Sequence, residues 1–261
     1  NTPYLSKHSI EEEFVFPASG YIEMILAAVK QVFESGNHLV KDLKFHQKLV
    51  IPTDDTFSSI QLKIKSQRTD SQLVIKEEVE KKNISQNVKF EFYVKTENEL
   101  WELFAAGEAQ IHAPFGNFRK FSKERFETEI ETAELKISKD SHYQVTAQLS
   151  IDYGELFQGV ETIFCRQNVG WVKVRIPKNI QNQTDYLLHP ALLDACLQAS
   201  IQVLPSDILE NLENSTFISA SIGSLQLMQP LASKCEELFV HLELTKVSEN
   251  RRTSYFTMLI S

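Results

Sequence analysis

Two short stretches, far apart in the sequence, each place an ionisable side chain beside an apolar run with helical character. The first extends from His8 to Pro17 and the second from His189 to Gln198. Asp194 and Gln198 are four residues apart, so in a helix they project from the same face. A carboxyl group in such apolar surroundings costs on the order of several kcal/mol unless a partner satisfies it. The two stretches are therefore candidate halves of one active site.

The chemistry that these residue types support is acid–base catalysis. A neutral imidazole can accept a proton near neutral pH, and a carboxyl whose pKa is raised by burial can donate one. We take His8, just upstream of the first apolar run, as the candidate base and Asp194 as the candidate acid. The alternative for His8 is a surface or satisfied core histidine, and for Asp194 a hydrogen-bond network in the core. His189 competes for the role of base, although its place at a helix start indicates a structural or orienting role.

The elements that must hold these residues are two helices on a background of strands. Helices are predicted over Ala18 to Phe33 and from Pro190 to about Val203, each opened by a proline and apolar on most faces. Alternation of apolar and polar residues predicts antiparallel strands around residues 60–64, 88–94, 172–176 and 238–244. One apolar helix surrounded by strands in each half predicts an α+β fold in which a sheet curled around a helix occurs twice.

Composition excludes several classes of protein. The chain has 261 residues and a formal net charge of −8, which argues against a nucleic-acid surface. We see no apolar stretch long enough to span a membrane and no signal-peptide pattern, so a cytoplasmic location is expected. Cys165, Cys196 and Cys235 are widely spaced and are read as reduced thiols. The strand-like sequence at the C-terminus suggests a piece of a longer polypeptide.

Four motifs, in order along the chain, resemble those of the dehydratase domains of modular polyketide synthases. The residues are His8, Glu12 and Pro17 with the adjoining helix, similar to H-x-x-x-G-x-x-x-x-P; Trp101 to Gly107; Tyr153 to Gly159, similar to Y-G-x-x-F-Q-G; and His189-Pro190 with Asp194 and Gln198, similar to H-P-x-x-x-D-x-x-x-Q. Each motif alone is weak, but the ordered set covers nearly the whole chain.

This resemblance implies a double hotdog fold, with two antiparallel sheets each wrapped around a central apolar helix. We expect an N-terminal hotdog over residues 1–112, a surface linker over 113–139 and a C-terminal hotdog over 140–261. The resemblance further implies a cleft between the halves that receives His8 from the first and Asp194 from the second. Gln198 would orient Asp194 or hold the leaving hydroxyl, and Tyr153 would hydrogen-bond in the same cluster. Backbone N–H groups at Ala18 to Gly20 would form an oxyanion site.

The reaction implied is loss of water from a 3-hydroxyacyl thioester, giving a 2-enoyl thioester. The substrate would be carried on the phosphopantetheine arm of an acyl carrier protein, with no metal or redox cofactor needed. Other domains of the same synthase and a second copy in a homodimer are the further partners expected. No nucleic-acid or membrane partner is expected.

Two alternatives to a dehydratase stay open, and a departure from the family pattern recommends the first of them. Glu12 stands where the motif has glycine, which usually serves a positive φ or a close approach of the substrate. A glutamate there would narrow the cleft, shift His8 or be tolerated, and a non-catalytic structural module is the corresponding alternative. The other alternative is an isomerase that shifts a double bond, or a cyclase, because proton abstraction by His8 serves these reactions as well. Retention of Asp194 favours dehydration, because departure of hydroxide needs an acid.

Overall fold

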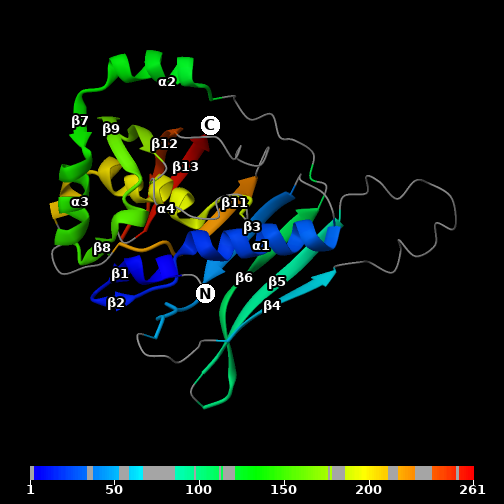
Figure 1. Cartoon of the computed structure of the whole chain (residues 1–261). Coiled ribbons are helices and arrows are strands. Elements are labelled where there is room, and N and C mark those ends of the chain that lie inside the picture. Colours follow the sequence, from blue (N-terminus) through cyan, green and yellow to red (C-terminus); the bar gives the residue numbers. More distant parts are fainter. Residues whose placement is uncertain are drawn as a thin grey trace, which may run out of the picture. The chain divides into compact units, whose positions relative to one another are not determined.

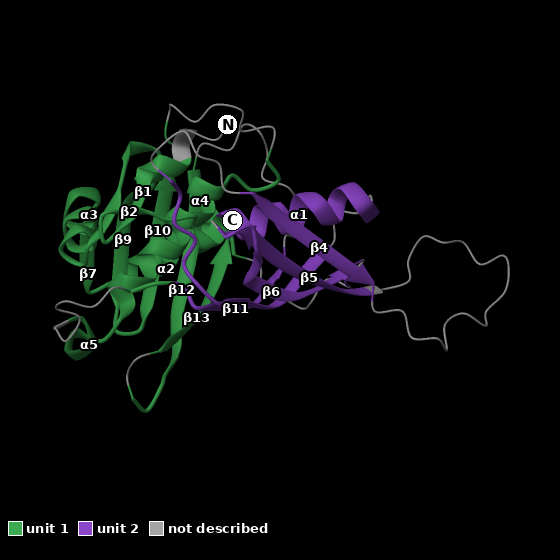
Figure 2. Ribbon diagram, turned by 90° about the horizontal axis from the view of Figure 1, so that it is seen from below, with its two compact units in different colours: residues 1–19, 119–218, 232–261 green, residues 20–118, 219–231 purple. Residues whose placement is uncertain are grey.

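A computed structural model describes most of the chain, which forms two compact units (Figure 2). Unit 1 comprises residues 1–19, 119–218 and 232–261, and unit 2 comprises residues 20–118 and 219–231. Each unit is considered by itself below. The residues that the structure describes are 3–33, 38–52, 59–66, 86–96, 98–111, 113, 121–175, 177, 186–210, 217–226, 237–250 and 253–261.

The core of unit 1 is a five-stranded antiparallel sheet with the order β13-β12-β10-β9-β7. Every second residue of β12 from Leu238 to Leu244 is buried, as the alternation in the sequence predicts. The strands are β7 (Leu135–Ser138), β9 (Val160–Arg166), β10 (Val169–Arg175), β12 (Glu237–Val247) and β13 (Ser254–Ile260).

Helix α4 (Pro190–Gln198) packs against β9 and β10 of this sheet and continues into a 3-10 turn, η6 (Ala199–Val203) (Figure 1). All but one of the residues of α4 are buried, which is the pattern of a helix enclosed by other elements. The remaining helical elements of unit 1 are η1 (Pro3–Lys7), α2 (Lys123–Glu129), η3 (Ile130–Thr132), α3 (Lys139–Gln148), η4 (Glu155–Phe157) and α5 (Ser206–Glu210).

A second, three-stranded sheet of unit 1 pairs strands near the N-terminus with a strand at residues 151–153. Its order is β2-β1-β8, with β1 (His8–Ile10) between β2 (Glu13–Phe14) and β8 (Ile151–Tyr153). The register pairs His8 with Tyr153 and Ile10 with Ile151. Through this backbone pairing, the described residues before Gly20 contact the unit that contains Asp194 and count with it.

Unit 2 consists of a five-stranded antiparallel sheet and helix α1. The helix spans Ala18–Phe33, the bounds predicted from the sequence, and its first two residues count with unit 1. Its fully buried residues fall on one helical stripe, and the Tyr21 ring packs edge-on against Phe92 of the sheet, with centroids 5.0 Å apart. The strands, in sheet order, are β11 (Ser221–Gln226), β3 (His38–Phe45), β6 (Trp101–Ile111), β5 (Gln86–Lys95) and β4 (Ile60–Ser66).

Both units thus pair an antiparallel sheet with an apolar helix, as the sequence predicts. Within the segment assigned to a linker, 113–139, the structure places regular elements: α2, η3 and β7. Phe121 and Phe126 are buried against Trp171, so this stretch contributes to the core of unit 1. The predicted boundaries at residues 112 and 140 stay predictions.

Candidate active site

His8 is held by the β1–β2 hairpin at both its backbone and its ring. Its carbonyl accepts a hydrogen bond from the backbone N–H of Val15 at 3.0 Å, and its ring Nδ1 lies 2.8 Å from the Val15 carbonyl oxygen. A carbonyl only accepts, so Nδ1 carries the proton in this contact and Nε2 of a neutral ring holds the free lone pair. The ring is buried and lies between Tyr153 and Phe157, with centroid distances of 5.5 and 5.3 Å. The Val15 carbonyl therefore fixes the ring of His8 through Nδ1, and its role as a base stays a prediction.

The turn that closes this hairpin consists of Glu11 and Glu12, and both have positive φ, 54° and 66°. This combination is the one that a type I′ hairpin turn requires. Glu12 is exposed, and the His8–Val15 hydrogen bond is present with the glutamate in place. The position therefore keeps the backbone conformation that glycine favours, although the residue is glutamate.

Asp194 is positioned by helix α4, whose start is capped by His189. The His189 Nδ1 accepts a hydrogen bond from the backbone N–H of Ala191 at 3.2 Å, and Pro190 occupies the first helical position. Burial lowers the pKa of His189 to about 4, so this imidazole is neutral at pH 7 and can accept. His189 thus caps the start of α4, and its role in orienting the site stays a prediction.

The Asp194 carboxyl is buried and interacts with Gln198 of the same helix and with His8 and Ser19 near the N-terminus. Its Oδ2 accepts a hydrogen bond from Gln198 Nε2 at 2.9 Å, and its Oδ1 accepts one from Ser19 Oγ at 3.4 Å. Burial raises the pKa of Asp194, while the neighbouring His8 and the hydrogen bonds from Gln198 and Ser19 act in the opposite direction. The buried surroundings of this carboxyl thus favour its protonated form, and His8 is near enough to act on its pKa.

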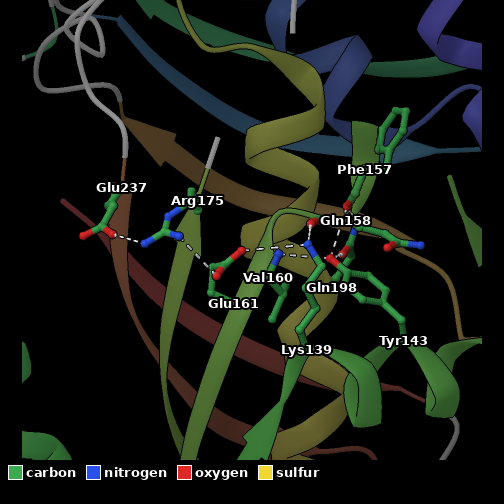
Figure 3. Close-up of polar contacts among 9 residues, drawn as sticks. All are labelled: Lys139, Tyr143, Phe157, Gln158, Val160, Glu161, Arg175, Gln198 and Glu237. Carbon is green, nitrogen blue, oxygen red and sulfur yellow. Dashed lines mark hydrogen bonds and ion pairs between the residues drawn. The ribbon is translucent and has the colours of Figure 1, made fainter. Parts of the chain in front are cut away.

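Gln198 is the centre of a buried hydrogen-bond network (Figure 3). Besides Asp194, its Nε2 donates to the Phe157 carbonyl oxygen at 3.0 Å. Its Oε1 accepts from the Tyr143 hydroxyl at 3.1 Å, and that hydroxyl in turn accepts from the Val160 backbone N–H at 3.0 Å. In these contacts the two N–H groups of the Gln198 amide donate to oxygen atoms, and its carbonyl oxygen accepts from a hydroxyl.

Tyr153 and Gly20 complete the set of residues that the sequence singled out. Tyr153 is buried opposite His8, and its carbonyl oxygen accepts from Gln158 Nε2 at 2.7 Å. Burial and the charge of Asp194 raise the pKa of the Tyr153 hydroxyl well above 10, so it stays neutral. Gly20 is buried in the first turn of α1 and belongs to unit 2. The oxyanion role of the N–H groups at Ala18 to Gly20 stays a prediction.

Unit 1 therefore brings together His8, Asp194, Gln198 and Tyr153, with His189 at the helix start. Sequence reasoning missed two further residues, Ser19 and Tyr143, that bond to Asp194 and to Gln198. Neither lies at a helical or strand spacing from its partner: Ser19 and Asp194 are 175 residues apart. The only signal for Ser19 is its place two residues after the motif proline, and α3 offers no sequence signal for Tyr143.

Three further features of the described residues concern metal binding, thiols and membrane spans. Among them, there is no group of three or more histidine, cysteine, aspartate or glutamate side chains placed to hold a metal ion. Cys165 and Cys196 are buried free thiols, and Cys235 lies outside the described residues. No helix in the described part of the chain is long and apolar enough to cross a membrane.

Comparison with solved structures identifies the fold. The dehydratase domain from the CurK module of curacin polyketide synthase aligns with a TM-score of 0.73, 24% identity and coverage of 99% of this chain and 88% of that chain. The dehydratase domain from the CurF module of the same synthase aligns with a TM-score of 0.75, 23% identity and coverage of 98% and 82%. These likenesses confirm the double hotdog class that the motifs implied.

Comparison with curated sequences gives distant relatives that are far longer than this chain. A highly reducing polyketide synthase from Pyrenophora dematioidea is 24% identical over 213 residues, which are 77% of this chain and 8% of the relative. Squalestatin hexaketide synthase from a Phoma species is 26% identical over 201 residues, which are 76% of this chain and 7% of the relative. The chain thus spans only 7–8% of the length of these relatives.

Family models match both ends of the chain. The model described as "Polyketide synthase dehydratase domain" matches residues 1–77, which contain His8. The model described as "Polyketide synthase dehydratase N-terminal domain" matches residues 123–257, which contain Asp194 and Gln198 and make up more than half of the chain. With the fold and the pairing of a buried histidine and a buried carboxyl, these matches lead to one conclusion: the chain belongs to the dehydratase domains of polyketide synthases.

Proposed function

We propose that this chain removes water from a 3-hydroxyacyl thioester to give a 2-enoyl thioester during polyketide assembly. One observation carries the proposal: unit 1 holds an imidazole whose Nδ1 donates to the Val15 carbonyl, leaving Nε2 as a base, and a buried carboxyl, Asp194, whose pKa burial raises. A base and an acid with separate, fixed roles are what elimination of water requires.

The proton transfers follow from these assignments. His8 Nε2 takes the proton from C2 of the acyl chain, and the electron pair of that C–H bond becomes the second bond of the alkene. The C3–O bond breaks, and Asp194 gives its proton to the departing hydroxyl, so that water leaves. His8 is then protonated and Asp194 ionised, and loss of the imidazolium proton and uptake of one by the carboxylate restore the starting pair.

The hydrogen bonds of Asp194 indicate which of its oxygens serves as the acid. Oδ2 accepts the 2.9 Å hydrogen bond from Gln198, so it acts as the carbonyl-like oxygen of the protonated carboxyl. Oδ1 has only the longer, 3.4 Å contact with Ser19, and it is the oxygen that would carry the proton. Gln198 therefore directs the acid rather than donating to the substrate in this proposal.

The partners of this reaction are also part of the proposal. The substrate is a thioester on the phosphopantetheine arm of an acyl carrier protein, and the reaction uses no metal or redox cofactor bound by this chain. Other domains of the same synthase and a second copy of the chain in a homodimer are the expected neighbours, in the cytoplasm. The described residues include an acid as well as a base, which favours dehydration over an isomerase or cyclase, because those reactions need no leaving hydroxide.

The test is incubation of the chain with a 3-hydroxyacyl carrier protein, followed by mass analysis of the acyl group. We expect the loss of one water with the wild type, and none with His8→Ala or Asp194→Asn. The matched controls are His46→Ala and Asp152→Asn, which change exposed residues outside the network and should retain the reaction. A change in the acyl chain without a change in mass would point to an isomerase or cyclase, and an unchanged substrate to a structural module.

A further inference from the structure

Helix α3 forms hydrogen bonds with the segment Phe157–Val160 through two side chains, Lys139 and Tyr143, that lie one helical turn apart (Figure 3). Lys139 Nζ donates to the Gln158 carbonyl oxygen at 2.7 Å. The Tyr143 hydroxyl accepts from the Val160 N–H at 3.0 Å and lies 3.3 Å from the Phe157 carbonyl oxygen. The segment thus held by α3 is the one whose Phe157 carbonyl accepts from Gln198.

Counting donors and acceptors fixes the direction of each bond in this network. The Val160 N–H can only donate, so the Tyr143 oxygen accepts there and has one proton left to give. That proton goes to Gln198 Oε1 at 3.1 Å, the shorter of its two contacts with acceptors. The two N–H groups of Gln198 then go to the Phe157 carbonyl and to Asp194. Rotating the amide by half a turn would place Oε1 against the Phe157 carbonyl, which is also an acceptor.

The orientation of this amide matters for the proposed acid. In the observed orientation Gln198 donates to Asp194, so the proton of Asp194 is available to a substrate hydroxyl. In the rotated orientation Oε1 would face Oδ2 and favour a proton on that oxygen, so the acid proton would be bonded to Gln198 instead. A buried amide whose oxygen has lost its donor is expected to sample the rotated orientation, because unpaired buried polar groups are costly.

We propose that Tyr143 is a positioning residue of the dehydratase reaction, which fixes the side-chain amide of Gln198 and thereby keeps the proton of Asp194 available. The inference rests on the proposed function. Tyr143 acts through Gln198 and does not contact the reacting atoms. It lies on α3, outside the motifs that carry the family resemblance.

The test compares Tyr143→Phe, which removes only the hydroxyl, with wild type in steady-state dehydration of a 3-hydroxyacyl carrier protein. We expect kcat to fall by about tenfold with KM nearly unchanged, because an interaction that acts on the acid is made in the transition state. The alkaline limb of the kcat profile should move to higher pH, because the rotated amide stabilises protonated Asp194. The titratable groups that act on Asp194 or respond to it are His8, Tyr143, Tyr153 and Cys196, and Tyr143→Phe leaves the other three in place.

A double-mutant cycle separates positioning from general damage. Tyr143→Phe should cause no further loss of kcat in a Gln198→Ala background, since Tyr143 acts through that amide. Tyr255→Phe, at an exposed tyrosine of β13, is the matched control and should behave as wild type. Additive losses, or a kcat for Tyr143→Phe within a factor of about two of wild type, would overturn the inference.

Two results distinguish this inference from the proposed function. An inactive wild type would refute the proposed function, whereas an active wild type with an equally active Tyr143→Phe would refute the inference alone. If Tyr143→Phe does not fold, the side-chain amide protons of Gln198 in the wild type provide the second measurement by NMR. Slow exchange of both protons with solvent supports the fixed amide, and fast exchange overturns it.

Discussion

The substitution Glu12→Gly should stabilise the protein without changing its reaction. Glu12 has a φ of 66° in an exposed two-residue turn. In this left-handed region the Cβ of an L-residue clashes with the following carbonyl oxygen. Glycine has no Cβ, and the motif that this stretch resembles has glycine at this position. The His8–Val15 hydrogen bonds join β1 to the residue that follows β2, outside the turn, so the orientation of the base should be retained.

The magnitude follows from two opposing contributions. An L-residue with left-handed backbone costs about 1–2 kcal/mol, which glycine relieves. Glycine also has more conformational freedom in the unfolded chain, which lowers the free energy of unfolding by about 0.4–1 kcal/mol. The net gain expected is about 0.5–1 kcal/mol in the free energy of unfolding. For a chain of this size, that corresponds to a rise in Tm of about 1–4 °C.

Urea unfolding of the wild type, Glu12→Gly and Glu12→Ala measures this effect. Alanine removes the same negative charge as glycine but keeps the Cβ, so the difference between the two variants isolates the backbone strain. We expect Glu12→Gly to be more stable than Glu12→Ala by about 1 kcal/mol, and both to dehydrate substrate at the wild-type rate. An alanine variant at least as stable as the glycine variant would refute the strain argument.

Three further predictions concern Asp194 and two other buried positions, Gly159 and His142. Asp194→Asn should lower dehydration by about 10²–10⁴-fold. Because burial raises the pKa of Asp194 in the folded state, we expect the stability of the wild type to fall as pH rises through the range in which Asp194 ionises. Asp194→Asn should abolish this dependence in urea unfolding at several pH values. Gly159→Ala places a Cβ 2.9 Å from the Ala195 Cβ on α4 and should cost about 1–3 kcal/mol in unfolding free energy, whereas Gly223→Ala, which meets nothing within 4 Å, should cost little. Burial lowers the pKa of His142 from 6.5 to about 4, so unfolding free energy should fall as pH drops through this interval, and a flat profile in denaturant titrations would contradict that assignment.

The elements of this protein could be predicted because their causes are local. Pro17 and the apolar residues after it determine where α1 begins, and its predicted bounds, Ala18–Phe33, agree with the structure. Alternation determines the strands, because successive side chains of a strand face opposite sides of the sheet. The contact between Asp194 and Gln198 was likewise expected from their spacing, since residues four apart meet on a helix.

Only the tertiary structure decided which groups surround the candidate acid and base. The ring of His8 is oriented by the Val15 carbonyl, and the pairing of β1 with β8 places His8 in the unit of Asp194. Tyr143 reaches Gln198 across 55 residues of sequence. Such contacts cannot be predicted from local propensity, because they depend on how sheets and helices pack and on the need of buried polar groups for hydrogen-bond partners. The sequence by itself determined helices α1 and α4, the alternating strands and the candidate acid and base. Packing determined the elements within residues 113–139, the orientation of the His8 ring and the hydrogen-bond partners of Asp194.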